Sequence, residues 1–342
     1  MKNIYQKINS GLTTLIAEAG VNHNGSLKIG KRLIDAAKRA GADCIKFQTY
    51  KAEKLTTRAA KRFWSWEGER KKNGTQYDSY SSLDKFNFKH YKYLFDYCKK
   101  KKIEFQSTPF DVDSLKILEK LGVNTYKIAS CDITNFLLLE KIAKTKKPIF
   151  LSTGAANINE IKDAVKLISK YNKKIVIMHC ILCYPTKMQD ANLKSITLLK
   201  QKFPQIPIGF SDHTLGTLAP TIASSLGASV IEKHFTINKK LKKSADHWLS
   251  VDEKELSQIA VNIKLSNLSL GKEVKKTFSC EGITKKNARR SLVANQDIKK
   301  GSKFTIKNLT TKRPGTGISA NQYFKYLGKI AKKNFSYDDL IS

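Results

Sequence analysis

Eight short apolar runs alternate with amphipathic segments in this chain, and that alternation limits its fold more than any other feature. The runs span residues 13–19, 43–49, 103–108, 125–130, 148–153, 174–180, 207–212 and 229–235. The segments between them carry helix signals, such as Ser26 as an N-cap with Gly41 closing the same segment, and an acidic first turn in residues 157–171. Eight strand and helix alternations predict an α/β fold, a (β/α)8 or TIM barrel.

Polar and charged residues recur at the carboxyl ends of these predicted strands. They are Glu18, Lys46, Gln48, Thr108, Lys127, Ser130, Ser152, Tyr184, Ser211, His213, Glu232 and His234. The carboxyl ends of barrel strands face the ligand site, and a strand buried on both faces has no structural use for an unpaired lysine. Lys46 and Lys127, with several hydroxyls, therefore predict a site for an oxyanion such as phosphate or carboxylate. The alternative is that the strand ends are misplaced and both lysines lie on the surface.

The segment from residue 209 to residue 235 predicts a β-α-β unit with a histidine at the end of each strand. Gly227 ends its helical part, and His213 and His234 would point from adjacent strand ends into one pocket. We expect the two imidazoles to share a divalent metal, and their charged neighbours Asp212 and Lys233 add to that expectation. The alternative is that each histidine is hydrogen-bonded within the core.

The formal charge of +34 comes from 63 Lys and Arg against 29 Asp and Glu. The lysines are scattered along the predicted helices and no nucleic-acid-binding motif occurs, so we expect a charged, solvent-facing surface and no nucleic-acid partner. No apolar stretch reaches the roughly 18 residues of a membrane span, and the first residues lack the apolar core of a secretion signal. The six cysteines show no disulfide framework. We therefore expect a cytoplasmic enzyme without a membrane partner.

The chain divides by pattern into a barrel domain over residues 1–271, a polar linker over 272–288 and a small β-rich domain over 289–342. The connection between the second and third predicted strands, residues 50–87, is unusually long and carries Trp64 and Trp66. A connection of this length predicts a lid or binding loop, or alternatively an oligomer contact.

The chain resembles the sialic acid synthase family. The segments that carry the resemblance occur in family order and are AEAGVNHNGSL, GADCIKFQTY, FQSTPFD, YKIASCDITN, PIFLSTG, GFSDHT, EKHF, ADHW and KRPGTGIS. The tail is similar to the antifreeze-like (SAF) domain of that family. The resemblance implies condensation of phosphoenolpyruvate with an N-acylated hexosamine, N-acetylmannosamine first, to give a nine-carbon 2-keto sugar acid.

The resemblance also implies roles for individual residues. His213 and His234 match the ligands of a divalent cation, Mn2+ first with Mg2+ or Co2+ as alternatives, and Glu18 matches a carboxylate near the bound water. The phosphoenolpyruvate site matches Lys46, Thr108, Lys127, Ser130, Ser152 and Ser211, and the amino-sugar site matches Gln48, Asp132, Tyr184 and Asp246. Arg313 matches an arginine that the small domain of a partner chain places over the sugar, which implies a domain-swapped homodimer.

Two positions depart from the family pattern on the sugar side. Cys131-Asp132 stands where many relatives have Gly-Glu, and Leu182 stands where sialate-making relatives often have Asn. These departures leave open the same reaction on a 2,4-diacetamido-trideoxyhexose, giving legionaminate, pseudaminate or a spore-coat sugar acid. A non-catalytic carbohydrate- or nucleic-acid-binding protein is the alternative from another class, but it does not explain the polar strand ends.

Overall fold

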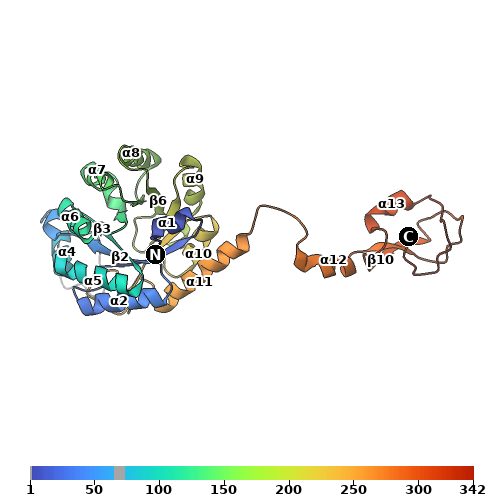
Figure 1. The fold of residues 1–342 in the computed structure, drawn as a ribbon, viewed down its shortest axis with the longest axis horizontal. Coiled ribbons are helices and arrows are strands. Elements are labelled where there is room, and N and C mark those ends of the chain that lie inside the picture. The colour runs from blue at the N-terminus through green and yellow to red at the C-terminus, as the bar shows by residue number, and fades with distance from the viewer. Residues whose placement is uncertain (1, 65–73) are drawn as a thin grey trace. The chain divides into compact units, whose positions relative to one another are not determined.

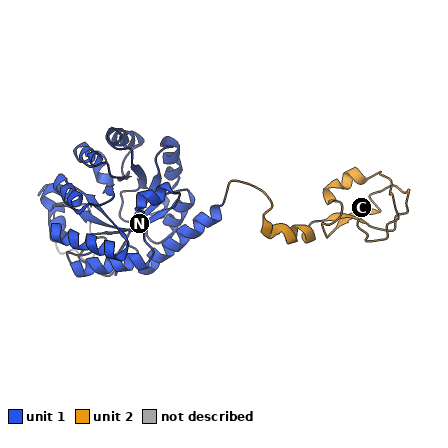
Figure 2. Cartoon of the chain, viewed as in Figure 1, with its two compact units in different colours: residues 1–271 blue, residues 272–342 orange. Residues whose placement is uncertain are grey.

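The computed structural model describes residues 2–64 and 74–342. These residues form two compact units, residues 1–271 and residues 272–342 (Figure 2). Trp66 lies outside the described residues. None of the helices in the described ranges is long and apolar enough to cross a membrane.

The first unit is a closed barrel of eight parallel strands, in which each strand pairs with the next and β1 pairs with β8 (Figure 1). The predicted TIM barrel is therefore confirmed. Each strand begins and ends within about two residues of a predicted apolar run. The strands are β1 (Thr14–Gly20), β2 (Cys44–Thr49), β3 (Glu104–Pro109), β4 (Tyr126–Ile128), β5 (Ile149–Ser152), β6 (Ile175–Cys180), β7 (Ile208–Asp212) and β8 (Val230–His234).

Helices surround the barrel and bury their apolar faces against the strands. Ser26 caps α2 as predicted, because its side chain accepts a hydrogen bond from the Ile29 N–H, and Gly41 follows the helix with φ +88°. The helices of this unit are α1 (Ile4–Asn9), α2 (Leu27–Arg39), α3 (Ala52–Leu55), α4 (Gln76–Leu83), α5 (Phe88–Lys101), α6 (Val112–Leu121), α7 (Phe136–Lys144), α8 (Ile158–Ser169), α9 (Lys194–Lys202), α10 (Leu218–Ser225) and α11 (Glu253–Leu270), with 3-10 turns η1 (Ser130–Asp132) and η2 (Met188–Asp190).

The barrel core has two parts. The larger part lies between the strands and the surrounding helices, and the smaller fills the barrel interior against Ile4 and Ile8 of α1. In Figure 1, α1 lies across the middle of the barrel. Gly209 on β7 is required for close packing, because a Cβ there would lie 2.3 Å from Val230 Cγ1 on β8.

The second unit contains the predicted small β-rich domain, with β9 (Ser291–Ala294) antiparallel to β10 (Leu309–Lys312) and several isolated bridges. Its core includes Leu292, Ile298, Phe304 and Phe335. The other elements are η3 (Ser279–Glu281), α12 (Gly282–Ala288), η4 (Ala320–Gln322) and α13 (Tyr323–Tyr326). The stretch expected to be a linker thus contains the short helix α12.

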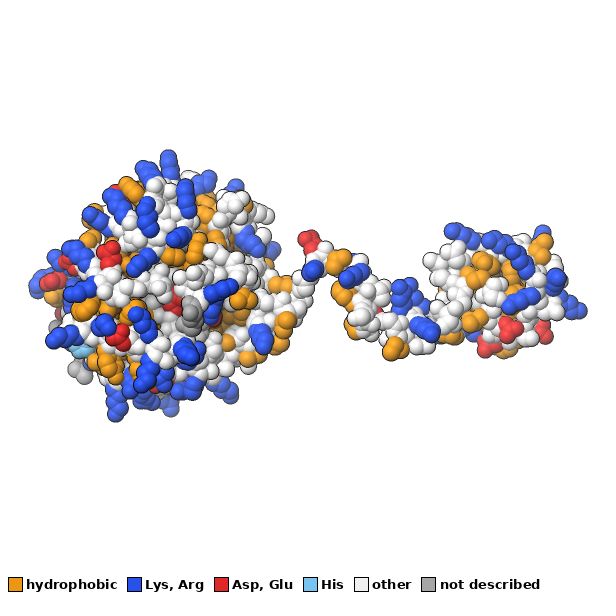
Figure 3. Space-filling view, viewed as in Figure 1, with side chains coloured by type: hydrophobic (Ala, Val, Ile, Leu, Met, Phe, Trp, Pro, Cys, Tyr) orange, Lys and Arg blue, Asp and Glu red, His pale blue; other side chains and the backbone are white. Residues whose placement is uncertain are grey.

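Lysine and arginine side chains are spread over the visible faces of both units, with fewer acidic side chains between them (Figure 3). This distribution agrees with the scattered lysines of the sequence.

Candidate active site

A cavity of about 350 Å3 lies at the carboxyl ends of the barrel strands. Every predicted site residue lines it except Asp132 and Arg313. The predicted residues that line it are Glu18, Lys46, Gln48, Thr108, Lys127, Ser130, Ser152, Tyr184, Ser211, His213, His234 and Asp246. The parallel barrel explains this convergence, because side chains at equivalent strand ends meet at one rim.

A buried cluster of two lysines and two carboxylates forms the floor of the cavity. Lys46 Nζ lies 2.6 Å from Glu18 Oε2. Lys127 Nζ lies 3.3 Å from Glu232 Oε1, which also lies 3.9 Å from Lys46 Nζ. Burial raises the pKa of Glu18, whereas the two lysine charges outweigh burial and lower the pKa of Glu232. The lysines are therefore core residues at the site, and the alternative that they lie on the surface is wrong.

Glu232 belongs to this cluster, although the sequence analysis counts it only among the polar strand ends and gives it no role in the site. Its Oε1 accepts a hydrogen bond from Ser211 Oγ at 2.9 Å, in addition to its contact with Lys127. The signal for it was present in the sequence, since Glu232 lies two positions before His234 and so faces the same side of β8.

Three hydroxyl side chains line the same cavity as the lysines. Thr108 Oγ1 accepts from Lys46 Nζ at 3.3 Å, and Ser130 Oγ accepts from the Gly154 N–H at 2.9 Å. Ser152 Oγ is buried and has no hydrogen-bond partner within the described residues. A buried hydroxyl without a partner is costly, so Ser152 is available to a bound ligand.

The two histidines lie side by side, with ring centroids 5.4 Å apart. His213 Nδ1 donates to the Ile181 carbonyl at 2.7 Å, which leaves Nε2 as the atom with a free lone pair. Burial and the neighbouring positive charges lower the pKa of His234 well below its usual value, so its imidazole is neutral. His234 Nδ1 is buried without a hydrogen-bond partner among the described residues, 3.8 Å from Asp246 Oδ2.

This donor set fits a divalent cation that takes one nitrogen lone pair from each of the two imidazoles. Although burial opposes it, the neighbouring Cys180 raises the pKa of His213, so a cation bound there would displace a proton. In the described ranges no group of three or more His, Cys, Asp or Glu is arranged to hold a metal. The remaining coordination positions would therefore belong to solvent and substrate.

Asp212 and Lys233 were expected to support a metal beside the histidines, but they form an ion pair with each other instead. Lys233 Nζ lies 2.6 Å from Asp212 Oδ2 and also donates to the Thr214 carbonyl, and neither side chain is exposed by more than 1%. They alternate with the histidines along β7 and β8, so they face away from the barrel interior. This ion pair links β7 to β8, and neither residue lines the cavity.

The outer wall of the cavity is largely apolar. It includes Leu55, Phe63, Trp64, Tyr80, Leu83, Phe110, Leu182, Trp248 and Leu249. Several of these residues come from the long connection between β2 and β3, which therefore contributes a wall of the cavity.

Asp246 and Tyr184 also line the cavity, close to the histidines. Burial, with the nearby charge of Glu18, raises the pKa of Asp246 to about 6. The Tyr184 ring lies 4.0 Å from the His213 ring, centroid to centroid.

Two predicted site residues are not part of this cavity wall. Asp132 lies on η1 and accepts a hydrogen bond from Asn135 Nδ2 at 3.0 Å, and its neighbour Cys131 lines the cavity in its place. Arg313 belongs to the second unit, directly before Pro314 and after β10. Its predicted role depends on a partner chain and stays a prediction.

The fold and the cavity define a (β/α)8 barrel with two buried lysines next to a pair of histidines at the carboxyl ends of its strands. A sequence model of the NeuB family matches residues 33–275, and one of the SAF domain matches residues 289–342. N,N'-diacetyllegionaminic acid synthase of Campylobacter jejuni is 42% identical over 96% of this chain and 98% of its own length. The enzyme of the same name from Legionella pneumophila is 38% identical over 94% of this chain and 91% of its own.

Two further proteins extend the comparison. N-acetylneuraminate-9-phosphate synthase of Homo sapiens is 32% identical over 96% of this chain and 90% of its own length. The crystal structure of N-acetylneuraminic acid synthetase from Leptospira borgpetersenii superposes with a TM-score of 0.71 at 37% identity, covering 80% of this chain and 90% of that one. The chain belongs to the NeuB family and carries its C-terminal SAF domain. It is a transferase of the nonulosonic acid synthase class, which makes nine-carbon sugar acids.

Proposed function

We propose that this protein condenses phosphoenolpyruvate with a 2,4-diacetamido-trideoxyhexose, giving a legionaminate-type nine-carbon 2-keto sugar acid and phosphate. The observation that carries the reaction is the buried pair of Lys46 and Lys127 beside His213 and His234 in one cavity. The family resemblance seen in the sequence alone puts N-acetylmannosamine first. The similarity to two legionaminic acid synthases favours the alternative sugar instead.

The outer wall of the cavity supports this choice of sugar. A 2,4-diacetamido-trideoxyhexose has an acetamido group and a methyl group where N-acetylmannosamine has hydroxyls at C4 and C6. Leu182, Trp64 and Trp248 offer apolar surface to such groups. A hydroxyl placed there without a partner would lose its hydrogen bonds to water.

Phosphoenolpyruvate would bind on the floor of the cavity. Lys46 and Lys127 would face its carboxylate and phosphate, with Thr108, Ser130, Ser152 and Ser211 as hydroxyl donors. Ser152 supports this role most directly, because its buried hydroxyl has no partner among the described residues. Glu18 and Glu232 hold the two lysine side chains in place by ion pairs before the ligand arrives.

The open-chain sugar would bind above, with its aldehyde oxygen toward the two histidines. A divalent cation, Mn2+ first with Mg2+ or Co2+ as alternatives, would supply Lewis-acid polarisation of that oxygen when bound by His213 and His234. Gln48, Tyr184 and Asp246 would orient the sugar, and Asp132 would act from the rim. We also propose that the active form is a domain-swapped homodimer, in which Arg313 of one chain serves the site of the other.

The proposed reaction begins with formation of a carbon–carbon bond. The enol carbon C3 of phosphoenolpyruvate attacks the aldehyde carbon, and a new C–C bond forms as the aldehyde C=O π bond breaks. The aldehyde oxygen takes up one proton and becomes a hydroxyl, which offsets the proton that water gives up in the next step, and C2 gains oxocarbenium character. Water adds to C2, and Glu18 accepts its proton. The tetrahedral intermediate then collapses by C–O cleavage, which leaves the 2-keto acid and inorganic phosphate. Lys46 and Lys127 stabilise the phosphate charge throughout.

Phosphate release from phosphoenolpyruvate tests this proposal. The sugars to compare are a 2,4-diacetamido-trideoxymannose, its altrose isomer and N-acetylmannosamine, each with Mn2+ and with a chelator. Chelator-sensitive release with the manno-configured diacetamido sugar is the expected result. Preference for N-acetylmannosamine or for the altrose isomer would replace the proposed sugar, and release with none of the three would refute the function.

A further inference from the structure

Asp246 lies in a long loop whose position is set by contacts with another part of the barrel. This loop, residues 237–250 and here called the Asp246 loop, connects β8 to α11. Its ends are fixed by backbone hydrogen bonds from Val251 N–H to the His234 carbonyl at 2.8 Å and from Thr236 N–H to the Val251 carbonyl at 3.0 Å. These bonds do not reach Asp246 itself, so the middle of the loop needs other anchors.

His247 provides the central anchor. It is completely buried, and both of its ring nitrogens have partners. Nε2 lies 2.9 Å from Asn24 Oδ1, in the turn after β1, and Nδ1 lies 2.8 Å from Thr236 Oγ1. Because the Asn24 oxygen only accepts, Nε2 carries the proton and Nδ1 accepts from the threonine hydroxyl. One neutral tautomer thus satisfies both contacts.

Two more contacts join the same loop to the same turn. Lys243 Nζ donates to the Asn24 carbonyl at 3.0 Å. Asn22 Nδ2 donates to Ser250 Oγ at 3.2 Å, and Ser250 Oγ in turn donates to the Asp246 carbonyl at 2.6 Å. The turn after β1 therefore holds the loop on both sides of Asp246.

We propose that His247 is a positioning residue, which holds the Asp246 loop against the turn after β1 so that the Asp246 carboxylate faces the sugar beside His234. This inference rests on the proposed function, because it assigns Asp246 to the sugar. His247 itself does not line the cavity. It acts only through the loop, and its loss affects sugar binding and leaves the phosphoenolpyruvate floor intact.

Kinetics of His247→Ala test the proposal, with His247→Gln as the conservative variant. Gln retains a donor near the position of Nε2, toward Asn24. We expect His247→Ala to raise the KM for the sugar about tenfold, the effect of losing one well-placed hydrogen bond, with the KM for phosphoenolpyruvate changed less than about twofold. His247→Gln should recover most of the loss. Equal changes in both KM values, or no change in either, would overturn the proposal.

A double-mutant cycle separates positioning from a general loss of stability. In the Asp246→Asn background, His247→Ala should lower kcat/KM for the sugar by less than about twofold, because its effect passes through Asp246. His179→Ala is the matched control. His179 is also buried and bonded, with Nε2 2.8 Å from the Ala191 carbonyl, but it does not line the cavity. A sugar-specific KM effect in His179→Ala would contradict the assignment.

A failure of the proposed function is distinguishable from a failure of this inference. If the unaltered protein turns over none of the sugars, the proposed function fails. Amide hydrogen exchange of residues 237–250 then tests separately whether His247 anchors the Asp246 loop. Faster exchange there in His247→Ala than in the unaltered protein and in His179→Ala supports the anchor. Unchanged exchange overturns it.

Discussion

Lys127→Met is the substitution that most directly tests the floor of the cavity. Methionine keeps an unbranched side chain of similar length but removes the charge. Lys127 is only 3% exposed, and its Nζ lies 3.3 Å from Glu232 Oε1. The substitution therefore removes one of two buried cations assigned to phosphoenolpyruvate, while Lys46 and Ser211 still contact Glu232.

The size of the effect follows from the distance. At an effective dielectric constant of about 20, two unit charges 3.3 Å apart attract each other by about 5 kcal/mol. A substrate oxygen at a similar distance would gain a comparable amount, and desolvation offsets part of it, so the net loss is about 2 to 4 kcal/mol. The expected fall in kcat/KM for phosphoenolpyruvate is roughly 30-fold to 1,000-fold.

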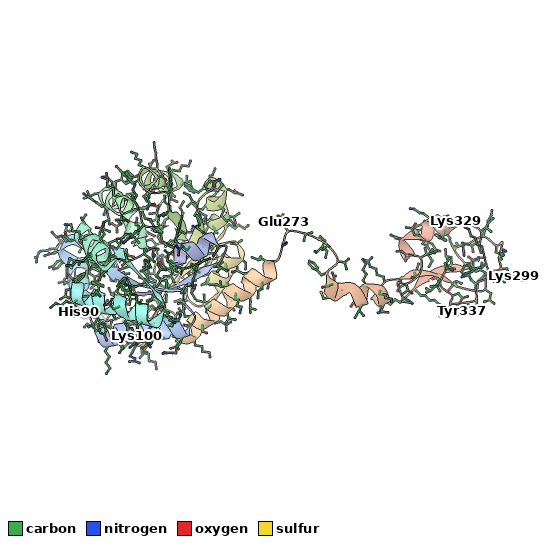
Figure 4. The ribbon with its side chains drawn as sticks, in the orientation of Figure 1. His90, Lys100, Glu273, Lys299, Lys329 and Tyr337 are labelled. Atoms are coloured by element: carbon green, nitrogen blue, oxygen red, sulfur yellow. The ribbon has the colours of Figure 1, made fainter. Side chains whose placement is uncertain are left out.

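The assay is steady-state phosphate release at saturating sugar and metal, with the melting temperature of each variant measured beside it. Lys100→Met is the control, because Lys100 on α5 is exposed on the outside of the barrel (Figure 4). It should leave kcat/KM unchanged. If Lys127→Met stays within threefold of the unaltered protein, the assignment of Lys127 to phosphoenolpyruvate is refuted.

Three further predictions concern stability, pH and metal. Lys233→Met should lower the free energy of unfolding by about 3 to 5 kcal/mol, because Asp212 stays buried without its counter-ion. Glu253→Gln, which breaks an exposed ion pair with Arg39, should lower it by less than about 1 kcal/mol. Equal losses for the two variants in urea unfolding would contradict this contrast. Burial raises the pKa of Glu104 from 4.5 to about 7, so its contribution to stability is complete below pH 4.5 and is lost as the pH rises through about 7. The free energy of unfolding should fall by about 3 kcal/mol over this pH range in the unaltered protein and should not fall in this way in Glu104→Gln. If the two proteins show the same dependence of unfolding on pH from 5 to 8, the raised pKa of Glu104 is ruled out. His213→Ala should abolish chelator-sensitive phosphate release while circular dichroism shows an intact fold. Full activity of His213→Ala after metal removal would exclude a role for His213 in binding a catalytic metal.

Much of the barrel could be predicted from local sequence. Barrel strands are buried on both faces, so they appear as short apolar runs whose limits agree with the observed strands within about two residues. Helix ends could also be predicted from nearby residues, as Ser26 and Gly227 show, because a capping residue acts on the backbone within a few residues. The convergence of Lys46, Lys127 and the two histidines also followed, since parallel strands bring their carboxyl ends to one rim.

Local sequence does not predict which partner each buried polar side chain binds. The sequence places Asp212 beside His213 and Lys233 beside His234, but only the register of β7 against β8 shows that the two charged residues bind each other. Similarly, Asp132 and Cys131 are adjacent in the chain, and the turn of η1 decides that Cys131 lines the cavity. Side-chain direction at a strand end depends on turn geometry that no periodic pattern encodes.

By itself, the sequence determined the number of barrel strands, their order along the chain and the strand ends at which most polar site residues gather, because these depend on residues close together in the chain. The tertiary structure alone decided that Glu232 lies between two lysines and that His247 holds the turn after β1. Asn24 and His247 are 223 residues apart, and they meet only because β8 closes the barrel against β1. Contacts that depend on this closure have no local signal, since no short segment contains both partners.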